Sequence, residues 1–177
     1  QNLAAAMAIY EAFPELRKEA WKTFCQTLSK QCEEINNFPL KLEYTEPDEI
    51  NSGFAGLWFK PANNQLNWCI NFEAQKINLT QICWGISGYN NCEVIEPVLY
   101  QELKNEATKA FGNERHSKYW PWWKWGEENP TSAKSFPIEL NSVKWLEMML
   151  SGKESLLTDM VWDKVNTLLN NMDKKYL

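Results

Sequence analysis

The chain of 177 residues has little of what most catalytic and metal sites require. It contains a single histidine, His116, and none of its five cysteines forms a Cys-x-x-Cys pair, so a zinc site is hard to assemble. Its seven glycines are scattered, which excludes a glycine-rich loop that cradles phosphate. The residue types alone therefore give no complete catalytic constellation.

Long apolar runs and runs of like charge are also missing. No stretch is long enough to span a bilayer, and the opening residues lack the basic region of a signal peptide. Free thiols in a reducing compartment are the simplest interpretation of the cysteines, so we expect a cytoplasmic protein that does not contact a membrane. A net charge of −5 argues against a uniformly basic nucleic-acid binder but leaves room for a local basic patch.

Tryptophan, by contrast, is abundant. The chain has ten, and four of them lie in the short segment 119–125. Each tryptophan buries on the order of 200 Å² when it packs. This Trp-rich segment is therefore either a part of the core or a binding platform. It reads Tyr119-Trp120-Pro121-Trp122-Trp123-Lys124-Trp125.

Basic residues flank or interrupt the Trp-rich segment: Arg115, His116, Lys118 and Lys124. Aromatic rings beside cations suit base stacking along single-stranded nucleic acid, at about 1–3 kcal/mol per base. They equally suit a hot spot for a partner protein. The structural alternative is that the rings cover the sheet or hold the last helices against it. The candidate binding residues are His116, Lys118, Tyr119, Trp120, Trp122, Trp123, Lys124 and Trp125.

Alternation within the segment makes a further prediction. In an extended chain, successive side chains point to opposite sides. Trp120 and Trp122 would then face one way, and Trp123 and Trp125 the other.

Hydrophobic periodicity predicts an α+β fold. Helical spacing indicates helices over 3–11, 14–35, 97–111, 143–150 and 157–172. Alternation indicates strands over 40–44, 54–59, 66–73 and 79–87, with a short one at 93–95. Short turns join successive strands, so we expect an antiparallel meander of about four strands with helices packed on one face. A single domain would span 1–177, with N-terminal helices in 1–35, the sheet in 40–95, and helices plus the Trp-rich segment in 97–177.

Asp48, Glu73 and Lys76 are a weak candidate for a metal-dependent nuclease site. Such enzymes hold Mg²⁺ with acidic side chains and steady the attacking water with a lysine. The usual carboxylate-x-Lys spacing places both side chains on one face of a strand. Here the spacing between Glu73 and Lys76 is one residue too long, so a regular strand puts the two on opposite faces. We therefore expect no cofactor unless this alternative holds, in which case the metal would be Mg²⁺.

The order of aromatic motifs resembles the C-terminal half of a group of bacterial proteins in the PD-(D/E)XK nuclease superfamily. The matching features are Leu57-Trp58-Phe59, the strand from Leu66 to Glu73, Trp84-Gly85-Ile86, the Trp-rich segment, and a closing helix with Leu168-Leu169 and Met172-Asp173. The resemblance implies that the catalytic motif of those proteins lies in an N-terminal domain. It implies an accessory region for this chain and carries no catalytic residue onto it.

These observations favour a non-catalytic recognition module of a nuclease-like protein, which contacts nucleic acid or a partner protein through the Trp-rich segment. One alternative is a divergent nuclease that uses Asp48, Glu73 and Lys76. Another is a protein-interaction or small-molecule-binding domain with an apolar pocket between sheet and helices.

Overall fold

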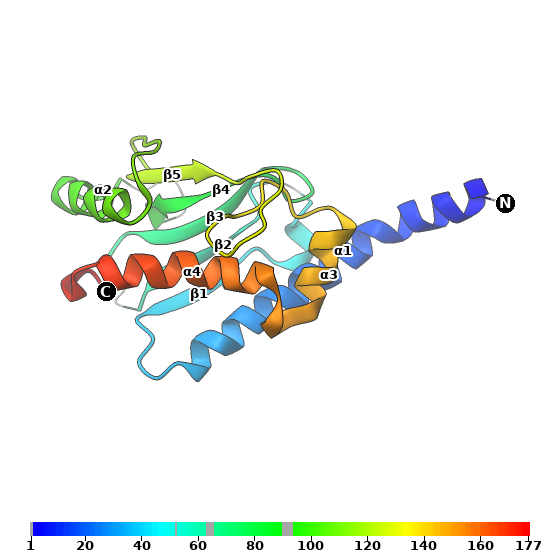
Figure 1. Ribbon diagram of the computed structural model, residues 1–177, viewed down its shortest axis with the longest axis horizontal. Helices are drawn as coiled ribbons and strands as arrows, with labels where there is room; N and C mark the ends of the chain where they lie inside the picture. Colours follow the sequence, from blue (N-terminus) through cyan, green and yellow to red (C-terminus); the bar gives the residue numbers. More distant parts are fainter. Residues whose placement is uncertain (1, 52, 63–65, 90–93) are drawn as a thin grey trace.

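The computed structural model describes residues 2–51, 53–62, 66–89 and 94–177 (Figure 1). Its helices and strands follow one another in the order expected from periodicity, apart from an extra strand late in the chain. In chain order they are α1 (Asn2–Glu34), β1 (Leu40–Tyr44), η1 (Pro47–Glu49), β2 (Gly56–Pro61), β3 (Cys69–Lys76), β4 (Thr80–Ser87), α2 (Pro97–Phe111), β5 (Trp122–Trp125), α3 (Val143–Ser151), η3 (Gly152–Glu154), α4 (Leu156–Asn171) and η4 (Lys174–Tyr176), where η marks a 3-10 helix.

The strands form one antiparallel sheet in the order β1-β2-β3-β4-β5, which confirms the expected meander and the α+β class. The sheet has five strands where about four were expected. The additional strand, β5, comes from the Trp-rich segment and pairs with β4, with Trp122 opposite Ile86 and Trp125 opposite Cys83. The short strand expected at 93–95 is not formed by residues 94 and 95, and residue 93 lies outside the described residues.

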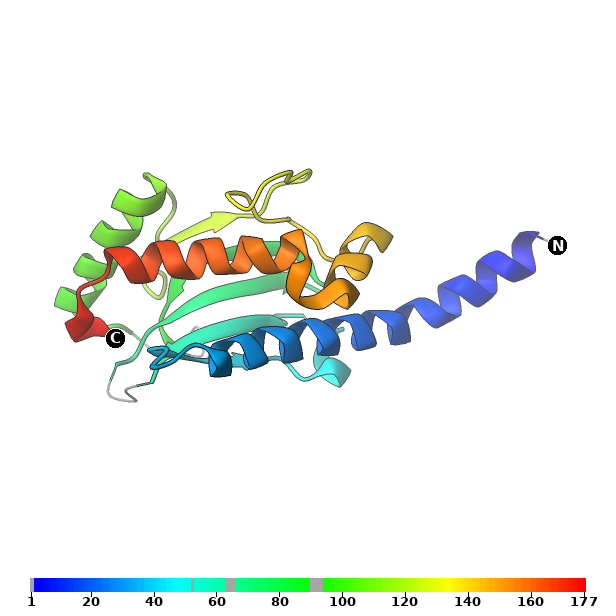
Figure 2. The ribbon, with the colours of Figure 1, turned by 60° about the horizontal axis from the view of Figure 1, so that its bottom comes forward.

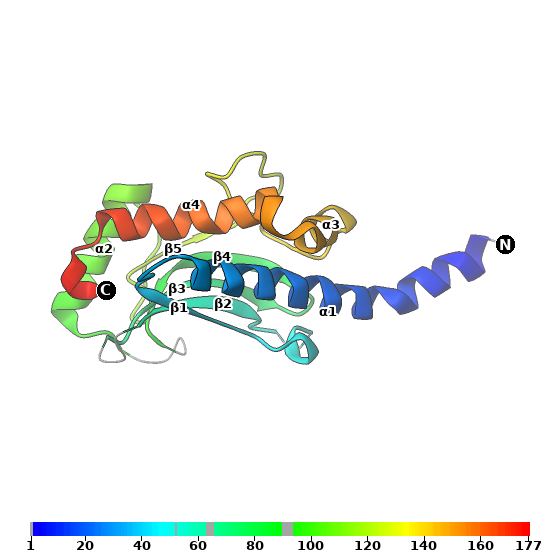
Figure 3. The ribbon, with the colours of Figure 1, turned by 90° about the horizontal axis from the view of Figure 1, so that it is seen from below.

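The helices cover one face of the sheet. Figures 2 and 3 show α1 and α4 running along this face, with α3 beside α1 and α2 at one end of the sheet. Of the α-helices in the described residues, none lies against the opposite face (Figure 3). Nor does any described helix combine the length and the apolar character that crossing a membrane requires.

Helix α1 is one helix of 33 residues, which corrects the expected division into two helices near Pro14. A proline inside a helix deprives the carbonyl four residues earlier, here that of Tyr10, of its hydrogen bond. Because Tyr10 is 81% exposed, water can replace the missing donor. The helix therefore continues through Pro14, and its first turns project beyond the sheet (Figure 1).

The core lies between the sheet and the helices. Every second residue of each strand points into the core, for example Phe59, Ile70 and Ile86. The buried faces of α1 and α4 contribute Phe24 and Val165. A core of this size, with side chains from every layer, is what stabilises an α+β domain of this length.

Trp122 joins three elements within this core. Its ring centroid lies 5.0 Å from that of Trp84 on β4 and 5.4 Å from that of Phe111 on α2. Its Nε1 donates a hydrogen bond to the carbonyl of Gly112, at 2.9 Å. With 1% of its surface exposed, Trp122 is a core residue that fixes β5 and the end of α2 to the sheet.

Gly85 allows β5 to approach β4 closely. A Cβ atom at this position would lie within 2.7 Å of the Cα of Trp123 and against the backbone oxygen of Trp122. Any side chain would therefore collide with rigid backbone rather than with a side chain that can move. The position and register of β5 depend on glycine at position 85.

We predict that Gly85→Ala lowers the free energy of unfolding by about 3 kcal/mol or more, because overpacking must displace β5 from β4. Displacement of β5 exposes Trp122, so the tryptophan emission of the native protein shifts to the red. The control is Gly152→Ala at the end of α3, where φ is +68° and the added Cβ meets only the side chain of Thr27. That control loses about 1–3 kcal/mol to backbone strain and keeps its emission. Urea titrations followed by tryptophan emission compare the two variants. Equal emission spectra of their native states would contradict the assignment of Gly85 as the residue that lets β5 approach β4.

Candidate functional site

The face of the sheet opposite the helices carries polar and aromatic side chains. The core takes alternate residues of every strand, so the residues between them point the other way. We call this surface the open face. It comprises Lys41, Glu43, Trp58, Lys60, Cys69, Asn71, Glu73, Gln75, Cys83, Ser87, Trp123 and Trp125.

Buried polar groups lie along the middle of the open face. Asn71 and Ser87 are fully buried, and Glu73 is 3% exposed. Asn71 Nδ2 donates to Ser87 Oγ at 3.3 Å, and Cys69 Sγ lies 3.2 Å from the same hydroxyl. Burying polar groups is costly unless they are hydrogen-bonded, so this row is unusual on a sheet face that no helix of the described residues covers.

The thiols on this face are held in their protonated form. Burial raises the pKa of Cys69 to about 12, and burial together with the negative charge of Glu73 raises the pKa of Cys83 to about 12. Cysteine chemistry needs the thiolate, which is scarce at neutral pH when the pKa is this high. Cys69 and Cys83 are therefore structural, and Cys92 lies outside the described residues.

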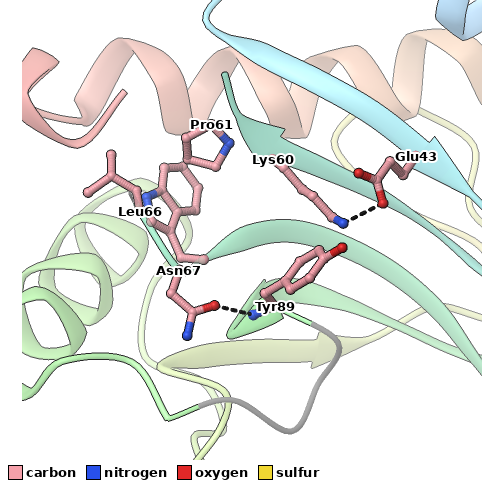
Figure 4. Close-up of a pocket in the computed structure, with 7 residues that line it drawn as sticks. Glu43, Lys60, Pro61, Leu66, Asn67 and Tyr89 are labelled. Carbon is pink, nitrogen blue, oxygen red and sulfur yellow. Dashed lines mark hydrogen bonds and ion pairs between the residues drawn. The ribbon is translucent and has the colours of Figure 1, made fainter. Parts of the chain in front are cut away.

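One pocket of the open face lies beside the ends of β2 and β3 (Figure 4). It has a volume of about 430 Å³, and its polar groups are already engaged with one another. Lys60 forms an ion pair with Glu43, and its Nζ lies 3.4 Å from the ring centroid of Tyr89. The backbone N–H of Tyr89 donates to Asn67 Oδ1 at 3.2 Å. Because Lys60, the one cation among the described lining residues, is neutralised, this pocket offers little attraction for an anion.

A second pocket lies against β5, and we call it the Trp pocket. Its volume is about 190 Å³, smaller than most sites for drug-sized molecules. The rings of Trp123 and Trp125 meet edge to face, with centroids 5.2 Å apart and planes at 88°, so they form a corner. This shape fits one small planar group rather than an extended ligand. The lining residues are Gln75, Cys83, Ser117, Trp120, Trp123 and Trp125.

Arg115 lies at the rim of the Trp pocket, beside the ring of Trp123, and two further basic residues, His116 and Lys118, follow it in the chain. Arg115 pairs with Trp123 across an isolated β-bridge, and its guanidinium carbon lies 5.3 Å from one ring centroid of that tryptophan. Lys118 Nζ lies 5.3 Å from the ring of Tyr119, and His116 is exposed between them in sequence. In the described residues, none of these three takes part in an ion pair with a carboxylate. The rim can therefore attract an anion.

Two of the candidate binding residues lie elsewhere. Trp122 is in the core, and Lys124, which shares its side of β5, lies 3.9 Å from Glu114 and 3.7 Å from Glu127. The expected alternation holds within β5 but not before it. Trp120 lines the Trp pocket instead of sharing the side of Trp122, because β5 begins only after the buried Pro121 and the chain turns there.

The three candidate nuclease residues lie in different settings. Asp48 is on η1, where its carboxylate pairs with Lys18 of α1 at 3.1 Å. Glu73 is on the open face, while Lys76 points the other way, because the register of β3 with β4 is regular from residue 73 to residue 76. Among the described residues, no group of three or more His, Cys, Asp or Glu side chains could hold a metal ion.

Gln75, Cys83 and Ser117 line the Trp pocket although none of them was a candidate binding residue. A signal for Gln75 was present. The polar residues between the apolar residues of β3 continue as far as position 75, but alternation alone does not distinguish the wall of a pocket from a solvated face. Ser117 could not have been found, because a loop residue gives no periodic pattern.

Comparison with protein-family models, with curated protein sequences and with solved structures finds no match for this chain. The function is therefore inferred from the chemistry of the open face.

We predict that Cys69 and Cys83 resist alkylation in the folded protein. Near pH 8, a thiol pKa of about 12 leaves a thiolate fraction roughly a thousandfold below that of an ordinary cysteine. Peptide mapping after iodoacetamide treatment should show both thiols unmodified until denaturant is added. Half-buried Cys32, whose pKa is about 11, is the internal comparison and should be modified before them. Rapid modification of Cys83 in the native protein would contradict its assignment as structural.

Proposed function

We propose that the chain is a non-catalytic recognition module that binds single-stranded nucleic acid at the Trp pocket. The observation that carries the proposal is the corner formed by Trp123 and Trp125 beside Arg115, which forms no ion pair with a carboxylate of the described residues. The resemblance of the aromatic motifs supports placing such a module in a nuclease-like protein of the PD-(D/E)XK superfamily. The setting of Asp48, Glu73 and Lys76 does not favour the nuclease alternative.

Stacking supplies the sequence-independent part of binding. Every base has a flat face, and an indole ring offers the largest surface for it among the side chains. Trp123 and Trp125 are only half-buried, so a ligand can reach both rings. A pocket of about 190 Å³ suits one unstacked base, while its sugar and phosphate stay outside at the rim.

The rim supplies the attraction for phosphate. Residues 113–125 contain three Lys or Arg residues and one acidic residue, whereas the whole chain has a net charge of −5. One of the three, Lys124, faces the other side of β5 and pairs with Glu114 and Glu127. Arg115 lies beside the ring of Trp123 and Lys118 beside the ring of Tyr119, so a phosphate that follows a stacked base meets positive charge. The acidic remainder of the chain restricts nucleic acid to this part of the surface by repulsion.

Fluorescence anisotropy with a labelled single-stranded oligonucleotide tests the ring contribution. Trp123→Ala should weaken binding by about 1–3 kcal/mol, since it removes one stacking platform. The control is Tyr10→Ala, which removes an exposed aromatic side chain from the projecting part of α1 and should leave the affinity unchanged. Equal losses in the two variants would contradict a site at the Trp pocket.

The salt dependence tests the role of the rim. Removing two phosphate contacts by Arg115→Gln with Lys118→Gln should reduce the slope of log K against log salt by about 1.4, at about 0.7 for each contact on a single strand. Lys22→Gln with Lys30→Gln, which removes two exposed charges from α1, is the matched control and should leave the slope unchanged. If the unmodified protein shows no saturable, salt-dependent binding, the proposed function is wrong.

A further inference from the structure

Gln75 lies at the wall of the Trp pocket with its carboxamide held in one orientation. Its Nε2 donates a hydrogen bond to Glu73 Oε1 and a second, at 3.5 Å, to Cys83 Sγ. Both acceptors are on the open face, Glu73 on the same strand and Cys83 directly opposite Glu73 on β4. The amide nitrogen is thus used within the protein.

The identity of these partners fixes which amide atom faces the ligand. The carboxylate of Glu73 accepts hydrogen bonds and donates none, so only the nitrogen of Gln75 can face it. Rotating the amide by half a turn would bring two oxygens together at a nearly buried site, which is unfavourable in a medium of low dielectric. The oxygen Oε1 of Gln75 is therefore the amide atom that is not turned toward Glu73.

This oxygen is available to a ligand. It has no hydrogen-bond partner among the described residues, and it is not among their buried unsatisfied atoms, so it is in contact with solvent. The wall of the pocket consequently presents an acceptor, and the negative charge of Glu73 lies behind it. Such a wall attracts N–H groups and repels carbonyl oxygens.

We infer that Gln75 makes the Trp pocket selective for bases with an exocyclic amino group, such as cytosine, over thymine and uracil. The inference rests on the proposed function. The amino group of cytosine projects two N–H donors from the edge of the ring. In thymine and uracil the one N–H of the pairing edge lies between two carbonyl oxygens, which would face the oxygen of Gln75 and the charge of Glu73. Stacking on one of the two perpendicular rings, Trp123 or Trp125, holds either base, and Gln75 distinguishes between them.

Short oligonucleotides of cytosine and of thymine test this inference, since both are pyrimidines that stack weakly on themselves. In a mildly alkaline buffer at one salt concentration, the unmodified protein should bind the cytosine oligonucleotide about tenfold more tightly. Gln75→Leu removes the acceptor but keeps the size of the side chain. It should reduce the ratio of the two affinities to about one, because the cytosine oligonucleotide loses its acceptor and the thymine oligonucleotide loses a repulsive contact.

Two further variants test whether the ratio of the two affinities depends on the orientation of the Gln75 amide. Gln26→Leu, at an exposed position of α1, is the control and should keep the ratio. Glu73→Gln replaces the acceptor-only carboxylate with an amide, which frees Gln75 to rotate, so the ratio should fall although Gln75 is still present. Equal binding of the two oligonucleotides by the unmodified protein, or an unchanged ratio in Gln75→Leu, would overturn the inference and leave the proposed function standing. Absence of binding to either oligonucleotide would instead overturn the proposed function.

Discussion

The close approach of β5 to β4 at Gly85 decides which tryptophans belong to the core and which reach solvent. Once β5 lies in register, alternation sends Trp122 into the cluster with Trp84 and Phe111 and sends Trp123 and Trp125 to the open face. The same strand thus anchors α2 to the sheet and supplies the rings of the Trp pocket. The stability of the core keeps the pocket in shape, because the rings on the two sides share one backbone.

The open face differs from the core in how its polar groups are used. In the middle of the sheet, Asn71 and Ser87 hydrogen-bond within the protein and are sealed from water. Toward the β5 edge, the same kind of network ends at Gln75, whose oxygen faces a pocket lined by indole rings. The indole rings provide a surface on which any base can stack, and the fixed oxygen of Gln75 accepts a hydrogen bond only from a base that offers an N–H group. The pocket therefore combines a sequence-independent contact with a selective one.

Much of the fold could be predicted from the sequence, and the site only in part. Alternation identified β3 and β4 and helical spacing identified α2, because these elements have one apolar side and clear ends at Pro97 and Gly112. Strand β5 was not predicted from the sequence, because four residues are too few for a periodic pattern and all but one are tryptophan. The side to which Trp120 points was predicted wrongly for a related reason, since the turn at Pro121 depends on tertiary packing. The role proposed for Gln75 depends on the hydrogen bond to Glu73 that orients its amide, and no local sequence pattern predicts such a bond.

NMR spectroscopy of the indole N–H groups tests binding at the Trp pocket most directly, because each of the ten tryptophans gives its own signal. We expect a single-stranded oligonucleotide to shift the signals of Trp120, Trp123 and Trp125 and to leave those of the buried Trp68, Trp84 and Trp122 in place. Shifts confined to other tryptophans, or no shift at saturating oligonucleotide, would contradict the assignment of the Trp pocket as the binding site.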